Sequence, residues 1–228
     1  MMNLLGYELA LIEVSIFFFI SYTLKNLLHN LRKINCLTYY WSMFTILTGF
    51  WELSFIKNYN QVYNVSTQLI HNKEHVWENK YSLDVLRPDK FSIIFYSEYA
   101  AWADREYMLK NDDWSRVIEG SHCLMCGLAC LMAFLFIIRN NLLEYYFITG
   151  IAMGSQLMNS VLYLVNYFHQ TRDTTNINYI TEKFPCGNLL QHRLFMYVNV
   201  LWFLMPSIII YNFILSLNSR REYIIYSK

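Results

Sequence analysis

The sequence predicts an all-α integral membrane protein, a bundle of five transmembrane helices. Of its 228 residues 55% are apolar, and the mean hydropathy is +0.21, both higher than soluble domains of this length usually show. The apolar residues gather in five blocks of about 20, the length at which a helix crosses a hydrocarbon core of about 30 Å. Because a lipid-exposed backbone must satisfy its own hydrogen bonds, we expect these blocks to be helices.

The five blocks follow one another with links of very different length. They cover residues 9–24, 37–56, 117–138, 145–168 and 194–217. The first block carries Glu13 and the second Glu52, and the third carries Glu119 and His122 near its start. Residues 139–141 are a short polar link between the third and fourth blocks. Each block is assigned one crossing, in chain order.

Basic residues indicate the side of the membrane on which each link lies. Arg32 and Lys33 lie in the first link, Arg139 in the third, and Arg220 in the C-terminal tail. With five crossings these segments share one side, which the positive-inside rule makes cytoplasmic. The 58–115 link has six Lys or Arg against nine Asp or Glu, as expected of the opposite side. The N-terminus is expected on that opposite side.

The chain is expected to form one membrane domain with two short flanks. In order, the segments are a first transmembrane helix with its basic link (1–35), a domain of four transmembrane helices (36–217) and a basic tail (218–228). The 58–115 link is rich in aromatic residues and is expected to lie on the membrane surface. Apolar residues at near-helical spacing predict an interfacial amphipathic helix over 91–109. Asp112 and Asp113 are expected to cap the third transmembrane helix.

Charge and cysteine content argue against several classes of protein. The net charge is +1 and no basic stripe is present, so a nucleic-acid partner is not expected. Cys123, Cys126 and Cys130 fall in the third block, where packing roles are expected and a disulfide framework is not. Glu119 and His122 form one half of a di-iron carboxylate motif whose second half is absent from the sequence, so no metal site is predicted.

Two carboxylates inside the predicted helices are the first candidates for chemistry. A carboxylate at the centre of a transmembrane helix costs about 2.5–3.5 kcal/mol and is tolerated when it faces a partner or a cavity. Glu52 lies near the end of its block and Glu119 near the start of the next, so both lie toward the non-cytoplasmic side and can meet across one pocket. The alternative is that each extends to the headgroups from about one turn inside a helix end.

Further candidates share single faces of the third and fifth blocks. Steps of three and four residues place on one face Glu119, His122, Cys123, Cys126 and Cys130. In the fifth block Asn199 and Trp202 are i, i+3 neighbours, and Pro206 frees a backbone carbonyl one turn before it. A buried indole and amide opposite two carboxylates suit a cationic centre. The alternative is that Asn199 joins two helices and Trp202 packs in lipid.

Together these residues resemble the emopamil-binding protein family, which includes sterol Δ8–Δ7 isomerases, within the EXPERA superfamily. Five spans in this order also match that family's bundle. The resemblance covers about residues 37–217, with an insertion in the 58–115 link. It rests on residues 49–52, 98–100 and 161–163, together with Asp104, Arg105, Tyr107, Glu119, Gly127, Arg139, Gly154, Gln156, Asn199, Trp202 and Pro206.

The resemblance implies roles for individual residues. Glu52 and Glu119 match the family's two catalytic carboxylates, Asn199 its pocket amide and Trp202 its cation-stabilising indole. The family's histidine, four residues before the second-block glutamate, is Thr48 here. His122 is the intramembrane histidine that could replace it as a catalytic group. The residues predicted to bind the ligand are Asn199 and Trp202 together with Thr48, Gln156 and Tyr163. Moving a ring double bond by acid–base chemistry needs no cofactor, so none is expected.

Two functions of different class follow. The leading prediction is a membrane protein with a sterol-sized or lipid-sized pocket that isomerises sterols or keeps a remnant of that site, located in the endoplasmic reticulum by resemblance. The alternative, which Thr48 favours, is a non-catalytic accessory subunit of a large membrane complex, such as a respiratory complex of the mitochondrial inner membrane. A non-catalytic sterol or amine receptor is a third prediction. Residues 64–66 are a glycosylation sequon, so a glycan there would indicate the endoplasmic reticulum.

Overall fold

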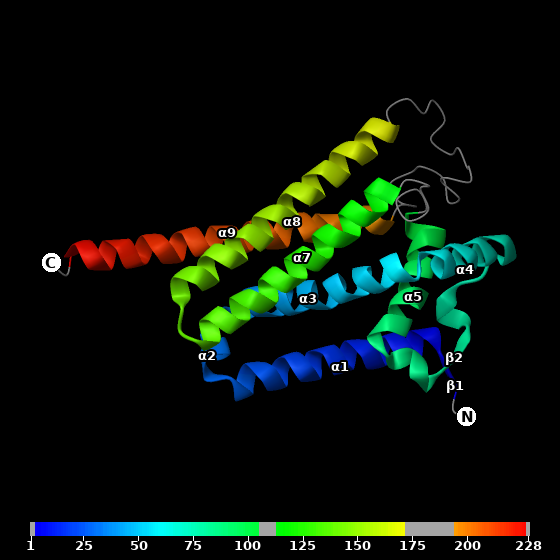
Figure 1. Cartoon of the computed structure of the whole chain (residues 1–228), viewed down its shortest axis with the longest axis horizontal. Coiled ribbons are helices and arrows are strands. Elements are labelled where there is room, and N and C mark those ends of the chain that lie inside the picture. The colour runs from blue at the N-terminus through cyan, green and yellow to red at the C-terminus, as the bar shows by residue number, and fades with distance from the viewer. Residues whose placement is uncertain (1–2, 105–112, 172–193, 227–228) are drawn as a thin grey trace.

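The computed structural model describes residues 3–104, 113–171 and 194–226, and it is a bundle of long helices (Figure 1). The five long helices are α1 (Gly6–Leu27), α3 (Cys36–Lys57), α7 (Asp113–Ile138), α8 (Leu142–Thr171) and α9 (Leu194–Tyr226). Each of the five apolar blocks falls inside one of them. Between α1 and α3 lies the short helix α2 (His29–Arg32).

Four helices in the described part of the chain are long and apolar enough to cross a membrane, namely α1, α7, α8 and α9. The chain is therefore an all-α, multi-pass integral membrane protein. The helix α3 has 22 residues but does not meet the same test of apolar composition. It carries several polar side chains, and those of Thr38, Ser42, Thr45 and Glu52 are buried inside the protein.

Glycines bring α3 and α7 into close contact. A Cβ atom on Gly49 would lie 2.9 Å from the backbone oxygen of Cys123, and one on Gly127 would lie 3.1 Å from the backbone oxygen of Thr45. Small residues at such positions let two backbones approach closely, and this packing replaces the hydrophobic drive that helices lack in lipid. The polar face of α3 is thereby covered by protein.

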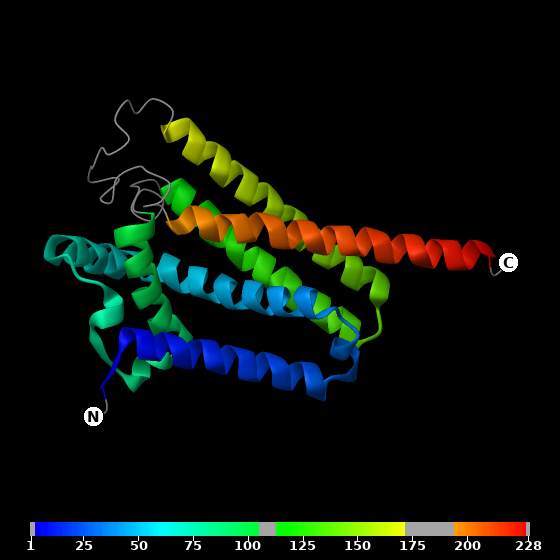
Figure 2. The same ribbon diagram turned by 180° about the vertical axis from the view of Figure 1, so that it is seen from behind.

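The two ends of the bundle differ (Figures 1 and 2). At one end α7 turns into α8 through Asn140, whose φ of 62° is the left-handed conformation that asparagine tolerates. The α1–α2–α3 connection lies at the same end. The helix α9 extends past this end and continues to Tyr226, so the described part of the expected 218–228 tail is helical. The start of α1 and residues 58–104 lie at the opposite end (Figure 1).

Residues 58–104 of the 58–115 link fold into a cap on that end of the bundle. Its described elements are α4 (Tyr59–Asn72), η1 (Val76–Glu78), β2 (Lys80–Ser82), η2 (Leu83–Leu86), α5 (Pro88–Glu98) and the π-helical η3 (Tyr99–Ala103). The strand β1 (Asn3–Leu5) pairs antiparallel with β2, with Leu4 opposite Tyr81. The sequence analysis predicted neither α4 nor this strand pair.

The amphipathic helix predicted over 91–109 differs in extent and in what it contacts. Helical structure begins at Pro88 and ends at Ala103, while residues 105–112, including Asp112, lie outside the described part of the chain. The side chain of Phe91 is buried and packs in a core cluster with Trp51 and Leu9. The apolar face of α5 therefore packs against the protein core, where the sequence analysis expected the membrane surface.

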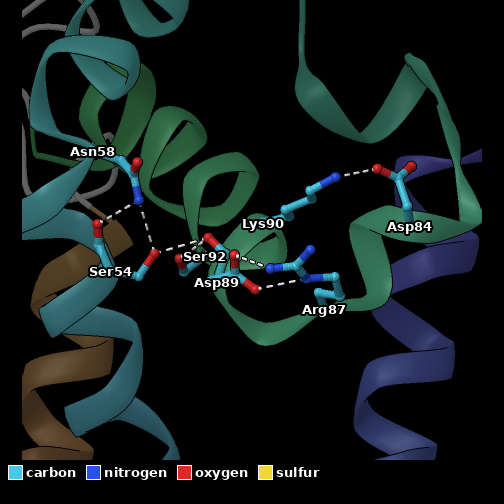
Figure 3. A network of polar contacts seen from close by, with 7 residues as sticks. All are labelled: Ser54, Asn58, Asp84, Arg87, Asp89, Lys90 and Ser92. Atoms are coloured by element: carbon cyan, nitrogen blue, oxygen red, sulfur yellow. Dashed lines mark hydrogen bonds and ion pairs between the residues drawn. The ribbon is translucent and has the colours of Figure 1, made fainter.

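A polar network fixes the start of α5 to the end of α3 (Figure 3). The Ser54 hydroxyl donates to the backbone oxygen of Asp89 at 2.8 Å, and Asn58 Nδ2 donates to the Ser54 backbone oxygen at 2.9 Å. Arg87 pairs with the Asp89 carboxylate through two N–H groups at 3.0 and 3.2 Å. Lys90 donates to Asp84, which holds the pKa of that exposed carboxyl below its usual range.

Candidate functional site

One cavity of about 480 Å³ opens among α1, α3, α5, α7, α8 and α9. Pockets that hold drug-sized ligands span about 300–1,000 Å³, so the volume suits a single multi-ring molecule. All eight site residues predicted from the sequence line it: Thr48, Glu52, Glu119, His122, Gln156, Tyr163, Asn199 and Trp202. Their functional roles remain predictions, while their convergence on one cavity is a property of the fold.

Aromatic side chains form much of the cavity wall, and they come from both the membrane helices and the cap. Phe17 and Phe18 of α1 face it, as does Trp77 of η1. The cap helix α5 adds Phe91, Phe95 and Tyr96. A wall of this kind favours an apolar ring system and leaves the few polar groups to orient it.

Glu52 is the most enclosed carboxylate of the cavity, with 8% of its surface exposed. Its Oε1 accepts a hydrogen bond of 2.6 Å from the Tyr96 hydroxyl. Its Oε2 has no hydrogen-bond partner among the described residues and lies 3.7 Å from where a Cβ on Gly120 would stand. Burial raises the pKa of Tyr96 well above its usual value, and the neighbouring Glu52 charge raises it further, so Tyr96 stays protonated and donates.

Glu119 lies on α7 and is only partly buried. Its Oε2 accepts a hydrogen bond from Asn159 Nδ2 of α8 at 3.4 Å. Glu119 is adjacent in sequence to Gly120, over which the Oε2 atom of Glu52 lies. The two carboxylates therefore occupy one region of the cavity, as the sequence analysis expected of groups near the same ends of their helices.

His122 is held on the α8 side of the cavity. Its Nε2 lies 2.8 Å from the Ser155 hydroxyl and 3.5 Å from the Cys126 sulfur, so the donor in each contact depends on the ring tautomer. Its buried Nδ1 has no hydrogen-bond partner in the part of the chain that the structure describes. One ring nitrogen of His122 is thus engaged and the other is enclosed without a hydrogen bond from the described residues.

Thr48 lies on α3, four residues before Glu52. Its hydroxyl donates back into its own helix, toward the backbone oxygens of Phe44 at 3.0 Å and Thr45 at 3.2 Å. A threonine has one hydroxyl proton, and here it is used inside the helix. Thr48 therefore shapes the wall of the cavity, and it can pass a proton to a ligand only by breaking its bond to the backbone.

Gln156 and Trp202 belong to a wall built around Trp41. Trp41 Nε1 donates to Gln156 Oε1 at 3.0 Å, and Gln156 Nε2 donates to the Thr45 hydroxyl at 2.9 Å. The Trp202 ring meets Trp41 edge to face, with centroids 4.8 Å apart. Gln156 thus positions Trp41, and through Trp41 it positions the Trp202 indole. Asn199 lies about one turn before Trp202 on α9.

Tyr163 connects the cavity to the cap, because its hydroxyl donates to Asp104 at the end of η3. Asp104 is buried, so this bond joins α8 to the segment that follows α5. No group of three His, Cys, Asp or Glu side chains within the described ranges is arranged to hold a metal ion.

The sequence analysis did not select several cavity residues. Glu13, Trp51 and Trp77 line it, as does Tyr96. Glu13 carried a usable signal, since it is a carboxylate inside an apolar block. Tyr96 carried none, because its hydrogen bond joins residues 44 positions apart in the sequence. Comparisons with protein-family models, curated proteins and solved structures find no match to this chain.

Proposed function

We propose that this chain binds a sterol-sized lipid in the cavity, with Glu52 and Glu119 directed at one part of its ring system. The single observation that supports this most is the Glu52 carboxylate. It is enclosed by protein, one of its oxygens has no partner among the described residues, and it faces an aromatic cavity. Burying a carboxylate in this way is costly, and a ligand that fills the cavity would supply the missing contact.

We propose α3 as the fifth membrane span. Its 22 residues are enough to cross a hydrocarbon core of about 30 Å. It packs closely on α7, and several of its polar groups find partners inside the protein, as in the bond from Thr45 to the Trp41 backbone oxygen. A buried helix of this kind can cross lipid without the apolar composition that an exposed helix needs.

The proposed chemistry is the shift of a ring double bond, in line with the resemblance to the emopamil-binding protein family. One carboxyl group donates a proton to an alkene carbon, and the Trp202 face stabilises the resulting tertiary cation. The second carboxylate removes a proton from the neighbouring carbon, so one proton enters and one leaves. Because the resemblance expects a histidine where Thr48 stands, the reaction is proposed to be weakened or lost. It would be retained if His122 takes over the proton transfer of that histidine.

The second candidate is a non-catalytic accessory subunit that keeps the lipid in place within a larger membrane complex. The observation that favours it is the Thr48 hydroxyl, which is bonded to the backbone and gives the proton relay no direct support. The first candidate places the chain in the endoplasmic reticulum, and the second in the mitochondrial inner membrane.

A photoreactive sterol bound to the purified protein in lipid nanodiscs tests the lipid site. The variant Leu47→Trp adds bulk to the cavity wall, and Phe19→Trp adds the same group to an α1 side chain that is 72% exposed. We expect labelling of cavity residues in the wild type and in Phe19→Trp, and its loss in Leu47→Trp. Equal labelling of all three proteins would show that the probe binds the outer surface, and the proposal would be wrong.

A further inference from the structure

A third carboxylate, Glu13, lies on the cavity and has no assigned role. It is the one Asp, Glu, His, Lys or Arg in the apolar block 9–24. Its Oε1 is buried and has no hydrogen-bond partner within the described ranges. An ionisable group in a transmembrane helix that finds no protein partner marks a functional site by default.

The face of α1 that carries Glu13 is turned toward the cavity. The residues of α1 that line it are Ala10, Glu13, Val14, Phe17 and Phe18, which recur at steps of three, one, three and one. That pattern is a single stripe along a helix. The opposite face carries Phe19, which is 72% exposed. Glu13 is therefore the polar position of a stripe that is otherwise apolar.

Glu13 lies at about the same depth in the bundle as Glu52 but on a different helix. It is seven residues from the start of α1, which is about 10 Å along the axis, and Glu52 is five residues from the end of α3, or about 7.5 Å. Those two helix ends lie at the same end of the bundle (Figure 2). A ligand in the cavity therefore meets carboxylates from two different helices.

The residues lining the cavity include Glu13, Glu52 and Glu119 but, in the part of the chain that the structure describes, neither Lys nor Arg. Glu52 receives the Tyr96 hydroxyl and Glu119 the Asn159 amide, whereas the buried Oε1 of Glu13 receives no such group from the described residues. Its natural complement is a hydrogen-bond donor that arrives with the ligand.

We propose that Glu13 binds the hydrogen-bond donor at the polar end of the ligand, a hydroxyl group or a protonated amine on an otherwise apolar molecule. The inference rests on the proposed lipid site and adds how the lipid is oriented within it. Glu13 fixes the polar end against α1, so that Glu52 and Glu119 meet the ring system away from that end. Glu13 is thereby a specificity residue, separate from the pair to which the chemistry is assigned.

Equilibrium binding to the full chain in nanodiscs tests this with cholesterol and its methyl ether, which lacks the donor. We expect the wild type to bind cholesterol at least about 10-fold more tightly than the ether, the size typical of a hydrogen bond to a charged group. The variant Glu13→Leu should bind both sterols equally. Glu144→Gln, at the exposed start of α8, is the matched control and should keep the wild-type preference.

An amine arm distinguishes the two kinds of donor. Glutamine at position 13 can still accept from a hydroxyl but carries no charge. A sterol with an amino group in place of the 3-hydroxyl is the third ligand. Glu13→Gln should keep most of the preference for cholesterol over its ether. It should lose any affinity for the 3-amino sterol that exceeds the affinity for cholesterol. A preference for cholesterol that survives in Glu13→Leu would overturn the role of Glu13 alone. A wild type that binds none of the three sterols would overturn the lipid site itself. Unchanged thermal unfolding of each variant confirms that the fold is intact.

Discussion

The hydroxyl of Tyr96, on the cap helix α5, donates a 2.6 Å hydrogen bond to Glu52 in the membrane helix α3. This contact makes the 58–115 link part of the cavity, since the link supplies the partner of its most enclosed carboxylate. We expect Tyr96→Phe to destabilise the protein by about 1–3 kcal/mol, because it leaves a buried acceptor unpaired. Thermal unfolding in detergent measures the effect.

Tyr63→Phe is the control for that substitution. Tyr63 is 39% exposed on α4, so removing its hydroxyl should change stability by no more than about 0.5 kcal/mol. The double variant Tyr96→Phe with Glu52→Leu should be less destabilised than the sum of the two single variants, since the two groups share one interaction. Additive effects would contradict the contact.

Replacing a packed glycine and an unpacked glycine by alanine should change the stability of the protein in opposite directions. Gly49→Ala should destabilise the bundle, because its Cβ would meet the Cys123 backbone oxygen at 2.9 Å. Gly150→Ala, in α8, meets nothing within 4 Å and should stabilise the helix by about 0.5–1 kcal/mol. Denaturation of both variants in the same detergent compares them directly, and equal shifts would show that α3 and α7 are less closely packed.

The crossing of α3 predicts which residues share a side of the membrane. Lys33 precedes α3 and Asn64 follows it, so single cysteines at these positions should react with a membrane-impermeant reagent from opposite sides. A cysteine at Asn141, in the link between α7 and α8, should react from the same side as the one at Lys33. Labelling of positions 33 and 64 from one side would remove α3 from the set of spans.

The proposed chemistry predicts how activity depends on the cavity residues. If the wild type restores growth to cells that lack sterol isomerase, Glu119→Gln should abolish it, because acid–base catalysis contributes about 10²- to 10⁴-fold. His122→Ala should abolish it as well if the relay has moved to α7. A wild type that fails while Thr48→His succeeds would show that the fold is kept for binding or assembly.

The glycosylation sequon gives a test of the compartment. Asn64 lies exposed on α4, on the side predicted to be non-cytoplasmic, while Ser66 is buried. A protein made in the endoplasmic reticulum should carry a glycan there, seen as a mobility shift on glycosidase treatment that Asn64→Gln removes. Absence of the shift together with mitochondrial import would favour the accessory-subunit function.

Four of the long helices could be predicted from sequence because each contains an apolar block of the length that a bilayer requires, and α3 could be predicted from a block of the same length that is less apolar. The convergence of Glu52 and Glu119 could be predicted too, since their positions in neighbouring blocks determine their depth. The cap could not be predicted in the same way. The helix α4 is polar overall, and the strand β1 has three residues whose hydrogen bonds depend on a partner far along the chain.

The site shows the same division. His122 and Trp202 were each selected by spacing along their own helix, which the sequence displays directly, and Thr48 was selected through the resemblance. Tyr96 was missed because its role depends on how α5 docks on α3, and that docking depends on polar contacts such as the bond from Ser54 to Asp89. Glu13 was visible as a carboxylate in an apolar block, but only the fold shows which face of α1 it occupies.

The pairing of β1 with β2 also determines the order in which the protein can be completed. Residues 3–5 precede α1, whereas their partners at 80–82 emerge from the ribosome only after α1 and α3 have been made. During that interval the N-terminal end of α1 has no strand to hold it beside the rest of the chain. The strand pair that holds the start of α1, the helix that carries Glu13, therefore forms only after two of the long helices have been made.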